Sequence, residues 1–223
     1  MLLSDSEYLN LIHQIDTFHF IQDEKWDWEH GLGHATRTAY YIKDILTQLE
    51  SDSRTVELGS IAALLHDIGL SKGNKKEHAL VSGAMANHYL EKLPLSSEEC
   101  KRIIQAIQDH SNGTDIQSSI GLALVLADKL DITYHRTIDS TIQDTINQNI
   151  QRIKKVTLIM NNDTMRLNYM VEEGFQKQLL KEWNKCLIIP MKIATYLKKQ
   201  FVFELNGIPE DVSFLILDEA TML

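Results

Sequence analysis

Cysteine is scarce in this sequence, and its scarcity excludes two classes of protein. Among the 223 residues only Cys100 and Cys186 are cysteines, which are too few and too far apart for a disulfide framework or a thiolate zinc site. We expect both to be ordinary, partly buried thiols. Unpaired thiols are typical of the cytoplasm, so we expect a cytoplasmic protein.

Long apolar runs are also missing. The apolar stretches fall far short of the about 20 residues that a membrane span needs; they are Ile61–Leu65, Ile120–Ala127 and Leu187–Ile189. The opening residues MLLSDSEYLN lack a basic region followed by an apolar core, so we expect no signal peptide. We also find no internal repeat, low-complexity tract or domain linker. The sequence therefore predicts no association with a membrane.

Positive charge is in deficit. Lysine and arginine number 22 against 31 acidic residues, and the formal net charge at pH 7 is −9. Long-range attraction to nucleic acid or to an anionic membrane is therefore not expected. A phosphorylated small molecule can still bind if a metal ion and a few cations concentrate positive charge locally.

Apolar periodicity predicts a mainly helical chain. Gly69 and the polar segment after it end one buried helix, and Pro94 separates two others, the second of which has Ser96 or Ser97 with Glu99 as a capping arrangement. The last apolar helix is expected to continue as a long polar one through about residue 153. The predicted helices cover residues 9–18, 32–49, 56–68, 78–93, 97–110 and 120–131.

Beyond about Lys155 the pattern changes to strand, turn, strand. A helix over about 174–199 follows, in which Pro190 should cause a kink or a split. The predicted short strands are Val156–Met160, Met165–Met170 and, as a third strand or extended edge, Phe201–Leu205. We therefore expect a mainly α fold, with a helical domain over 1–155 and a β-hairpin plus helix extension over 156–223 packed on it. The extension could cap a pocket, form a homodimer interface or extend the core.

His66 and Asp67 are the most informative pair of residues. They lie in the segment LLHDIGL, at the expected end of a buried helix. An unpartnered carboxylate there would cost several kcal/mol or become protonated, whereas a divalent cation would compensate it. Histidine and aspartate are usual ligands of Mn, Fe, Ni and Zn.

Asp128 presents the same problem, because it directly follows the apolar run Leu122–Ala127. Lys129 points about 100° away around the helix, which leaves Asp128 able to face inward. A single histidine on an apolar face is more often structural than functional. We apply that structural interpretation to His13, His19, His30, His88 and His135.

The ordered set His34, His66-Asp67 and Asp128, in the segments GLGHATRTA, LLHDIGL and LALVLADKLD, resembles the HD-domain superfamily of metal-dependent phosphohydrolases. That family has a His, then a His-Asp pair, then a distant Asp on a helical bundle. His34 matches the first position best, because HATR resembles the family's His-x-x-Arg; His30, four residues earlier, is the alternative. The resemblance covers about residues 30–135 and implies an HD-type bundle that binds one or two divalent ions.

Some branches of the superfamily add two histidines and bind two ions. His78, in KEHALVSGA with Gly83 five positions later, and His110, in IQAIQDHS, resemble these additional ligands; His88 competes weakly with His78. The family often has Lys directly after HDIG, where this chain has Leu70 and, two residues later, Lys72. The absence of an HHExxxGxGYP segment argues against the cyclic-di-GMP branch.

The resemblance implies a metal-dependent phosphohydrolase that cleaves a phosphoester or phosphoanhydride of a nucleotide or small phosphorylated metabolite with a metal-activated water. Asp67 would bridge two ions and orient the nucleophile. Arg37 and Lys72 are candidate substrate-binding residues, and Lys129 or Lys72 would neutralise developing charge; an ordinary ion pair is the alternative for Arg37 and Lys129. The metal identity stays open among Mn, Fe, Ni, Mg and Zn.

Two rival functions remain. Mixed-valence di-iron oxygenases of the superfamily use the same six-ligand arrangement with O₂, and a catalytically silent HD regulatory module would keep the bundle without turnover. Intact core ligands make the silent module the less expected of the two.

Overall fold

The computed structural model describes residues 3–4, 6–7, 9–13, 28–72, 75–111, 116, 118–137, 144–213 and 215. The chain divides into two compact units, Met1–Asp128 and Lys129–Leu223. The predicted division near residue 155, into a helical domain and an extension, stays a prediction.

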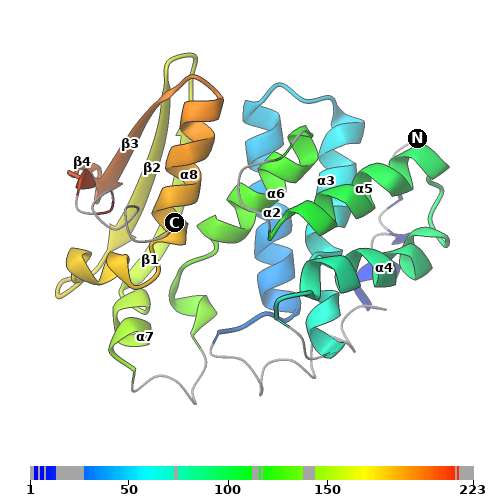
Figure 1. The fold of residues 1–223 in the computed structure, drawn as a ribbon, viewed down its shortest axis with the longest axis horizontal. Helices are drawn as coiled ribbons and strands as arrows, with labels where there is room; N and C mark the ends of the chain where they lie inside the picture. The colour runs from blue at the N-terminus through cyan, green and yellow to red at the C-terminus, as the bar shows by residue number, and fades with distance from the viewer. Residues whose placement is uncertain are drawn as a thin grey trace. The chain divides into compact units, whose positions relative to one another are not determined.

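The first unit is helical, as the sequence predicts. Helix α3 is its central helix, because every residue from Leu58 to Leu65 is buried. It packs against α2 and α5, and α4 packs against α5 and against a short 3-10 helix, η1 (Figure 1). The elements are α2 (Leu32–Gln48), α3 (Ser53–Leu65), η1 (Ile68–Lys72), α4 (His78–Leu90), α5 (Ser97–Asp109) and α6 (Ser119–Leu130), whose last two residues fall in the second unit.

The N-terminus of α5 is fixed by the predicted cap. Ser96 accepts a hydrogen bond from the backbone of Glu99, and the Glu99 side chain accepts one from the backbone of Ser96. Glu99 also accepts a hydrogen bond from Arg54 of α3, whose Nε lies 2.6 Å from Glu99 Oε1. This arrangement ties the beginning of α5 to α3 and sets the direction in which α5 runs.

Gly69 allows the turn after α3 to approach α4 closely. Its backbone N–H donates to Ser82 Oγ at 2.8 Å. A Cβ at position 69 would lie 2.5 Å from the carbonyl oxygen of His78 and 2.5 Å from the backbone nitrogen of Ser82. Only glycine fits this contact without displacing backbone, so Gly69 holds the His66-Asp67 turn against the helix that begins at His78.

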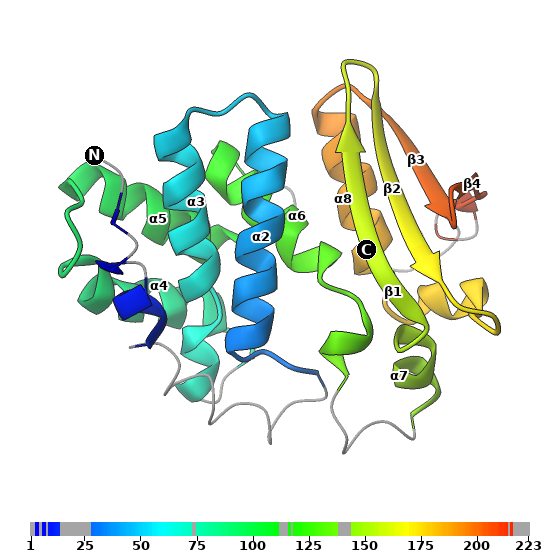
Figure 2. The ribbon, with the colours of Figure 1, turned by 180° about the vertical axis from the view of Figure 1, so that it is seen from behind.

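The second unit contains a four-stranded sheet in the order β1-β2-β3-β4. β1 (Ile153–Met160) and β2 (Thr164–Val171) form the predicted antiparallel hairpin, and β4 (Ile208–Pro209) is a short antiparallel edge. β3 (Gln200–Leu205) pairs parallel with β2, and the intervening α8 (Lys185–Tyr196) packs on β3 (Figure 2). A parallel pair requires such a crossover connection.

The core of this unit lies between the sheet and α8. Tyr169 and Phe203 are buried and stack edge to face at 5.1 Å between ring centroids. Pro190 lies inside α8 and has no N–H to donate to the carbonyl of Cys186. The hydroxyl of Tyr169 donates to that carbonyl instead, at 3.4 Å. The helix therefore continues past Pro190 rather than splitting there.

Two predicted helices are wrong in extent. α6 ends at Leu130, and Thr133 is extended, so the chain does not continue as a long helix to residue 153. It forms instead a 3-10 turn, η2 (Tyr134–Arg136), and a short helix, α7 (Thr145–Ile150), that Asp144 caps. The helix over 174–199 is also shorter than predicted. Gly174 has a φ of +84°, a left-handed conformation that cannot be part of an α-helix. Between Gly174 and α8 the chain forms a short 3-10 helix, η4 (Lys177–Lys181).

Three smaller predictions concern the rest of the chain. Residues 9–13 are helical, whereas the remainder of the predicted 9–18 helix lies outside the described residues. Both cysteines are free; Cys186 is buried and Cys100 is partly exposed. No helix in the described parts of the chain has the length and apolar character that crossing a membrane requires.

We predict that Gly69→Ala is more destabilising than Gly83→Ala. The new methyl group at position 69 meets backbone, whereas at position 83 it meets the side chain of Gln108, which can move. Overpacking against a rigid neighbour typically costs about 1–3 kcal/mol. Urea unfolding of both variants and wild type measures the difference; equal free energies of unfolding for the two variants would contradict the rigid contact at Gly69.

Candidate metal centre

All six predicted ligands belong to the first unit and lie near helix ends or within a turn. His34 is the third residue of α2, and Asp128 is near the end of α6. His66 caps the C-terminus of α3, and Asp67 follows it. His78 begins α4, and His110 caps the C-terminus of α5. The structure brings all six side chains together; their roles as metal ligands stay predictions.

One group of donors consists of His34, His66 and Asp128. The Nε2 atoms of the two histidines lie 3.2 Å apart. Asp128 Oδ1 lies 3.3 Å from His34 Nε2 and 4.0 Å from His66 Nε2. Both imidazoles are completely buried. Three donor atoms from three helices therefore point at one small volume.

A second group consists of His78 and His110. Their Nε2 atoms lie 3.0 Å apart. Asp67 Oδ1 lies 3.4 Å from His78 Nε2 and 3.5 Å from His110 Nε2. The two groups have no histidine in common.

The carboxylate of Asp67 joins the two groups. Its Oδ1 faces His78 and His110, whereas its Oδ2 lies 3.4 Å from His66 Nε2 and 3.7 Å from His34 Nε2. Only 3% of Asp67 is exposed. One buried carboxylate therefore offers one oxygen to each group, which is the position of a bridging ligand.

Backbone carbonyls orient three of the imidazoles. The Nδ1 atoms of His66, His78 and His110 lie 2.7, 2.7 and 2.6 Å from carbonyl oxygens three residues earlier, those of Ala63, Lys75 and Ile107. A carbonyl oxygen only accepts, so each Nδ1 carries the hydrogen. In a neutral ring the lone pair is then on Nε2, which is the nitrogen that faces the other donors.

This arrangement fits a cation. The Nε2 atoms of His78 and His110 lie 3.0 Å apart, and as bare lone pairs they would repel each other; a positive ion between them, or a hydrogen on one of them, removes that repulsion. Two donors that each lie about 2.1 Å from one ion are roughly 3.0 Å apart at a right angle and roughly 3.4 Å apart at a tetrahedral angle. The distances from the Asp67 oxygens to the Nε2 atoms that face them are 3.4, 3.4, 3.5 and 3.7 Å, at or slightly above the tetrahedral value. His34, His66, Asp67 and Asp128 would hold one ion, and His78, His110 and Asp67 a second.

The protonation states also suit a metal. Burial lowers the pKa of His66 to about 3, so this imidazole is neutral at pH 7. Burial by itself would raise the pKa of Asp67, but the surrounding imidazoles of His66, His110 and His30 outweigh burial and hold it well below its usual range. A neutral imidazole and an ionised carboxylate are the forms that bind metal.

The partial charges at helix ends also favour a cation at this cluster. α3 ends at His66 and α5 ends at His110, so the C-termini of two helices meet at the cluster. The C-terminus of a helix carries a partial negative charge that favours cations.

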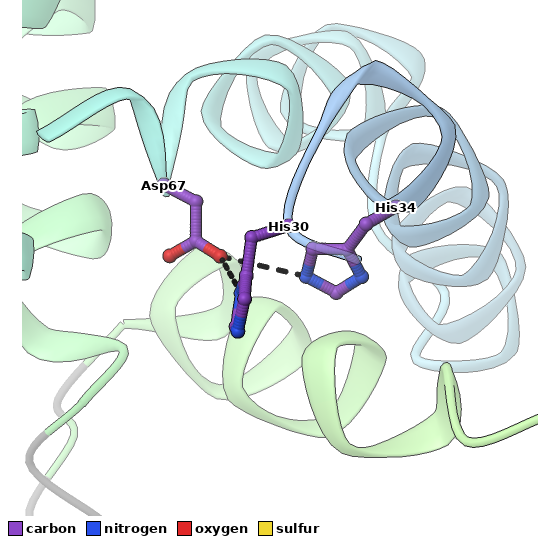
Figure 3. A group of neighbouring side chains, drawn as sticks. All are labelled: His30, His34 and Asp67. Atoms are coloured by element: carbon purple, nitrogen blue, oxygen red, sulfur yellow. Dashed lines mark hydrogen bonds and ion pairs between the residues drawn. The ribbon is translucent and has the colours of Figure 1, made fainter. Parts of the chain in front are cut away.

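His30 lies in the cluster, although the sequence suggested an ordinary structural histidine. His30 Nδ1 lies 2.9 Å from Asp67 Oδ2, and Figure 3 shows the rings of His30 and His34 both directed at this carboxylate. His30 precedes the helix N-cap, Gly31, and is therefore not on the helical face of His34. The spacing of four residues between His30 and His34 drew attention to His30 in the sequence. It was interpreted there as an alternative to His34 and not as an additional residue of the cluster.

Sequence reasoning also missed Glu29. Its Oε1 accepts a hydrogen bond from the backbone N–H of His34 at 2.9 Å, where α2 has no cap from its own N-cap residue. Its Oε2 pairs with Arg37. Glu29 thus fixes the first turn of α2, on which His34 lies.

The other predicted site residues lie as follows. Arg37 is half-buried and paired with Glu29, which is the ion-pair alternative considered for it. Lys72 is exposed at the end of η1, five residues after Asp67. Lys129 follows Asp128 in the last turn of α6. The functions of all three stay predictions.

The family comparison agrees with this geometry. The family model of the HD domain matches residues 31–133, a segment that contains all six predicted ligands. The resemblance is therefore confirmed over this part of the chain, which matches the HD domain. Together the match and the cluster support a metal-dependent hydrolase of the HD type in general.

The chain is similar to a predicted HD superfamily hydrolase from an uncultured Thermotogales bacterium, with 24% sequence identity and a TM-score of 0.46. The similarity covers 58% of this chain and 68% of that one. No curated protein matches the chain significantly.

We predict two divalent ions per wild-type chain and one in His78→Ala. This substitution removes a donor of the second group without touching His34, His66 or Asp128. Metal analysis after loading with Mn²⁺ and dialysis gives the ratio. His88→Ala, on the exposed side of α4, is the control and should retain two. Two ions in His78→Ala would contradict the assignment of the second group.

We also predict that the metal-free protein loses stability as the pH falls from about 6.5 toward 3. The pKa of His66 is lower in the folded chain than in the unfolded one, so the unfolded state binds the proton first. The depressed pKa of Asp67 acts in the same direction below its ordinary value of 3.8. Urea unfolding with chelator at several pH values measures the slope. His66→Gln should flatten it between pH 6.5 and 5, and His88→Gln should leave it unchanged.

Proposed function

We propose that this protein is a metal-dependent phosphohydrolase that cleaves a phosphoester or phosphoanhydride bond of a nucleotide or other small phosphorylated metabolite. The observation that carries the proposal is the position of Asp67. Its two oxygens face two different groups of imidazoles in a buried site. A carboxylate in that position would hold two cations close together, one through each oxygen.

The chemistry of the donors supports this reaction class. Imidazole nitrogens and carboxylate oxygens suit Mn, Fe, Ni or Zn, and Mg is the further candidate. Paired divalent ions lower the pKa of a bound water and neutralise charge on a phosphoryl group during in-line displacement. Such paired sites are common in phosphatases and nucleases.

The charge distribution favours a small substrate. The chain carries a net charge of −9, so an extended polyanion such as a nucleic acid would be repelled along most of its length. A small phosphorylated molecule needs positive charge only at the metal centre. We therefore propose a small-molecule substrate, in a cytoplasmic protein that can be a homodimer.

The protein side chains have separate tasks in this proposal. Asp67 orients the nucleophile between the two groups of donors. Lys72 is exposed, five residues after Asp67, and we assign phosphate binding to it in preference to Arg37, which already pairs with Glu29. Lys129, next to Asp128, neutralises charge that develops on the substrate.

The test is a screen for released phosphate. Nucleotides, dinucleoside polyphosphates and sugar phosphates are incubated anaerobically with protein loaded with Mn²⁺ or Mg²⁺. We expect hydrolysis of at least one class, and a loss of at least about 100-fold in His66→Ala and Asp67→Ala, because each removes a ligand. His88→Ala is the matched control and should keep wild-type activity.

The outcomes separate the rival functions. Full activity of His66→Ala or Asp67→Ala, with the fold intact by circular dichroism, would refute the site. Oxygen consumption that depends on iron, without phosphate release, would select the di-iron oxygenase. Metal binding without any turnover would select the regulatory module.

A further inference from the structure

His30 differs from the other histidines of the cluster in the nitrogen that it presents. His66, His78 and His110 present Nε2 and anchor Nδ1 on the backbone. His30 presents Nδ1, which lies 2.9 Å from Asp67 Oδ2. That separation is the most common length of an N–H···O hydrogen bond.

The direction of this hydrogen bond follows from the carboxylate. An ionised carboxylate only accepts hydrogen bonds, so Nδ1 of His30 must carry the hydrogen. A nitrogen that carries a hydrogen has no lone pair for a metal. Nδ1 of His30 is therefore arranged as a donor to Asp67, although the group His30, His34 and Asp67 is close enough together to hold an ion if that hydrogen were lost.

The same oxygen of Asp67 also faces His66 and His34 at 3.4 and 3.7 Å. A carboxylate oxygen has two lone pairs, so Oδ2 can accept a hydrogen bond from His30 while it faces the first group of donors. The hydrogen bond restricts rotation of the carboxylate about its Cβ–Cγ bond. Restricting Oδ2 also fixes Oδ1, which faces His78 and His110.

We propose that His30 is a positioning residue for the metal centre, which keeps the Asp67 carboxylate in the orientation that serves both groups of donors. The inference rests on the proposed metal site but not on the substrate or the reaction. His30 acts on both ions through one oxygen, although it would contact neither. It lies before the N-cap of α2, and its side chain is 15% exposed, whereas that of His34 is 0% exposed.

The experiment replaces His30 with three residues that differ in where they offer an N–H group. The side-chain amide nitrogen of Asn is the same number of bonds from Cα as Nδ1 of His, and that of Gln is one bond farther. His30→Asn can therefore keep the hydrogen bond, whereas His30→Gln misplaces it and His30→Ala removes it. His88→Ala serves as the control outside the cluster.

Mn²⁺ affinity, measured by calorimetry and by electron paramagnetic resonance of free Mn²⁺, is the readout. Loss of a residue that orients a metal ligand typically weakens metal binding about 10- to 100-fold. We expect that loss in His30→Ala and His30→Gln, at both ion positions. We expect His30→Asn to recover most of the wild-type affinity, and His88→Ala to equal the wild type.

Three results would overturn the inference. Wild-type affinity in His30→Ala would show that Asp67 needs no such support. Loss of affinity in all three variants at only one ion position would make His30 a ligand of that ion. The amide nitrogen of Asn can donate a hydrogen bond but cannot bind a metal in place of the imidazole nitrogen. Equal loss in all three, with a lower melting temperature of the metal-free protein, would make His30 a structural residue of the α2 N-terminus.

These results are distinct from failure of the proposed function. If the wild type binds Mn²⁺ but releases no phosphate from any substrate, the hydrolase proposal fails while the His30 series still decides the inference. If the wild type binds no divalent ion, the metal centre and the role of His30 are both overturned.

Discussion

The buried carboxylate of Asp67 is the group on which the arrangement of the first unit depends. It lies at the end of an apolar helix, where a negative charge without partners would be strongly unfavourable. Imidazoles approach it from both sides, and both of its oxygens are used. The ends of α3 and α5, the beginning of α4 and the tight contact at Gly69 all serve to bring those imidazoles to it.

The backbone, more than any network of side chains, directs the histidines. His66 and His110 occupy the same position relative to their helices, since each caps a C-terminus and donates to the carbonyl three residues earlier. A helix leaves its last carbonyls without intrahelical partners. Those carbonyls here fix which ring nitrogen is protonated, so that formation of the helix also prepares the donor atom.

The sequence allowed a correct prediction of the helical bundle. His66, Asp67 and Asp128 stand out because each follows an apolar run, whereas His34, His78 and His110, which the structure brings to the same cluster, were singled out through the family resemblance. The sequence indicated His30 only as an alternative to His34, because His30 lies before the helix N-cap Gly31, where helical spacing does not apply. The long helix beyond α6 was wrong because the break at Thr133 has no glycine or proline to mark it. The parallel pairing of β2 with β3 joins segments about 30 residues apart, and local patterns carry no information about such partners.

The convergence of two helix C-termini on the cluster has a consequence for the order in which ligands can enter. Without an ion, the cluster presents carboxylate oxygens, partial negative charges from α3 and α5, and a neutral His66, and an anionic group would be repelled there. Divalent cations reverse the sign of that local potential. If the protein acts as proposed, metal would therefore have to bind before an anionic substrate, and the abundance of the metal in the surroundings would govern whether that substrate is bound at all.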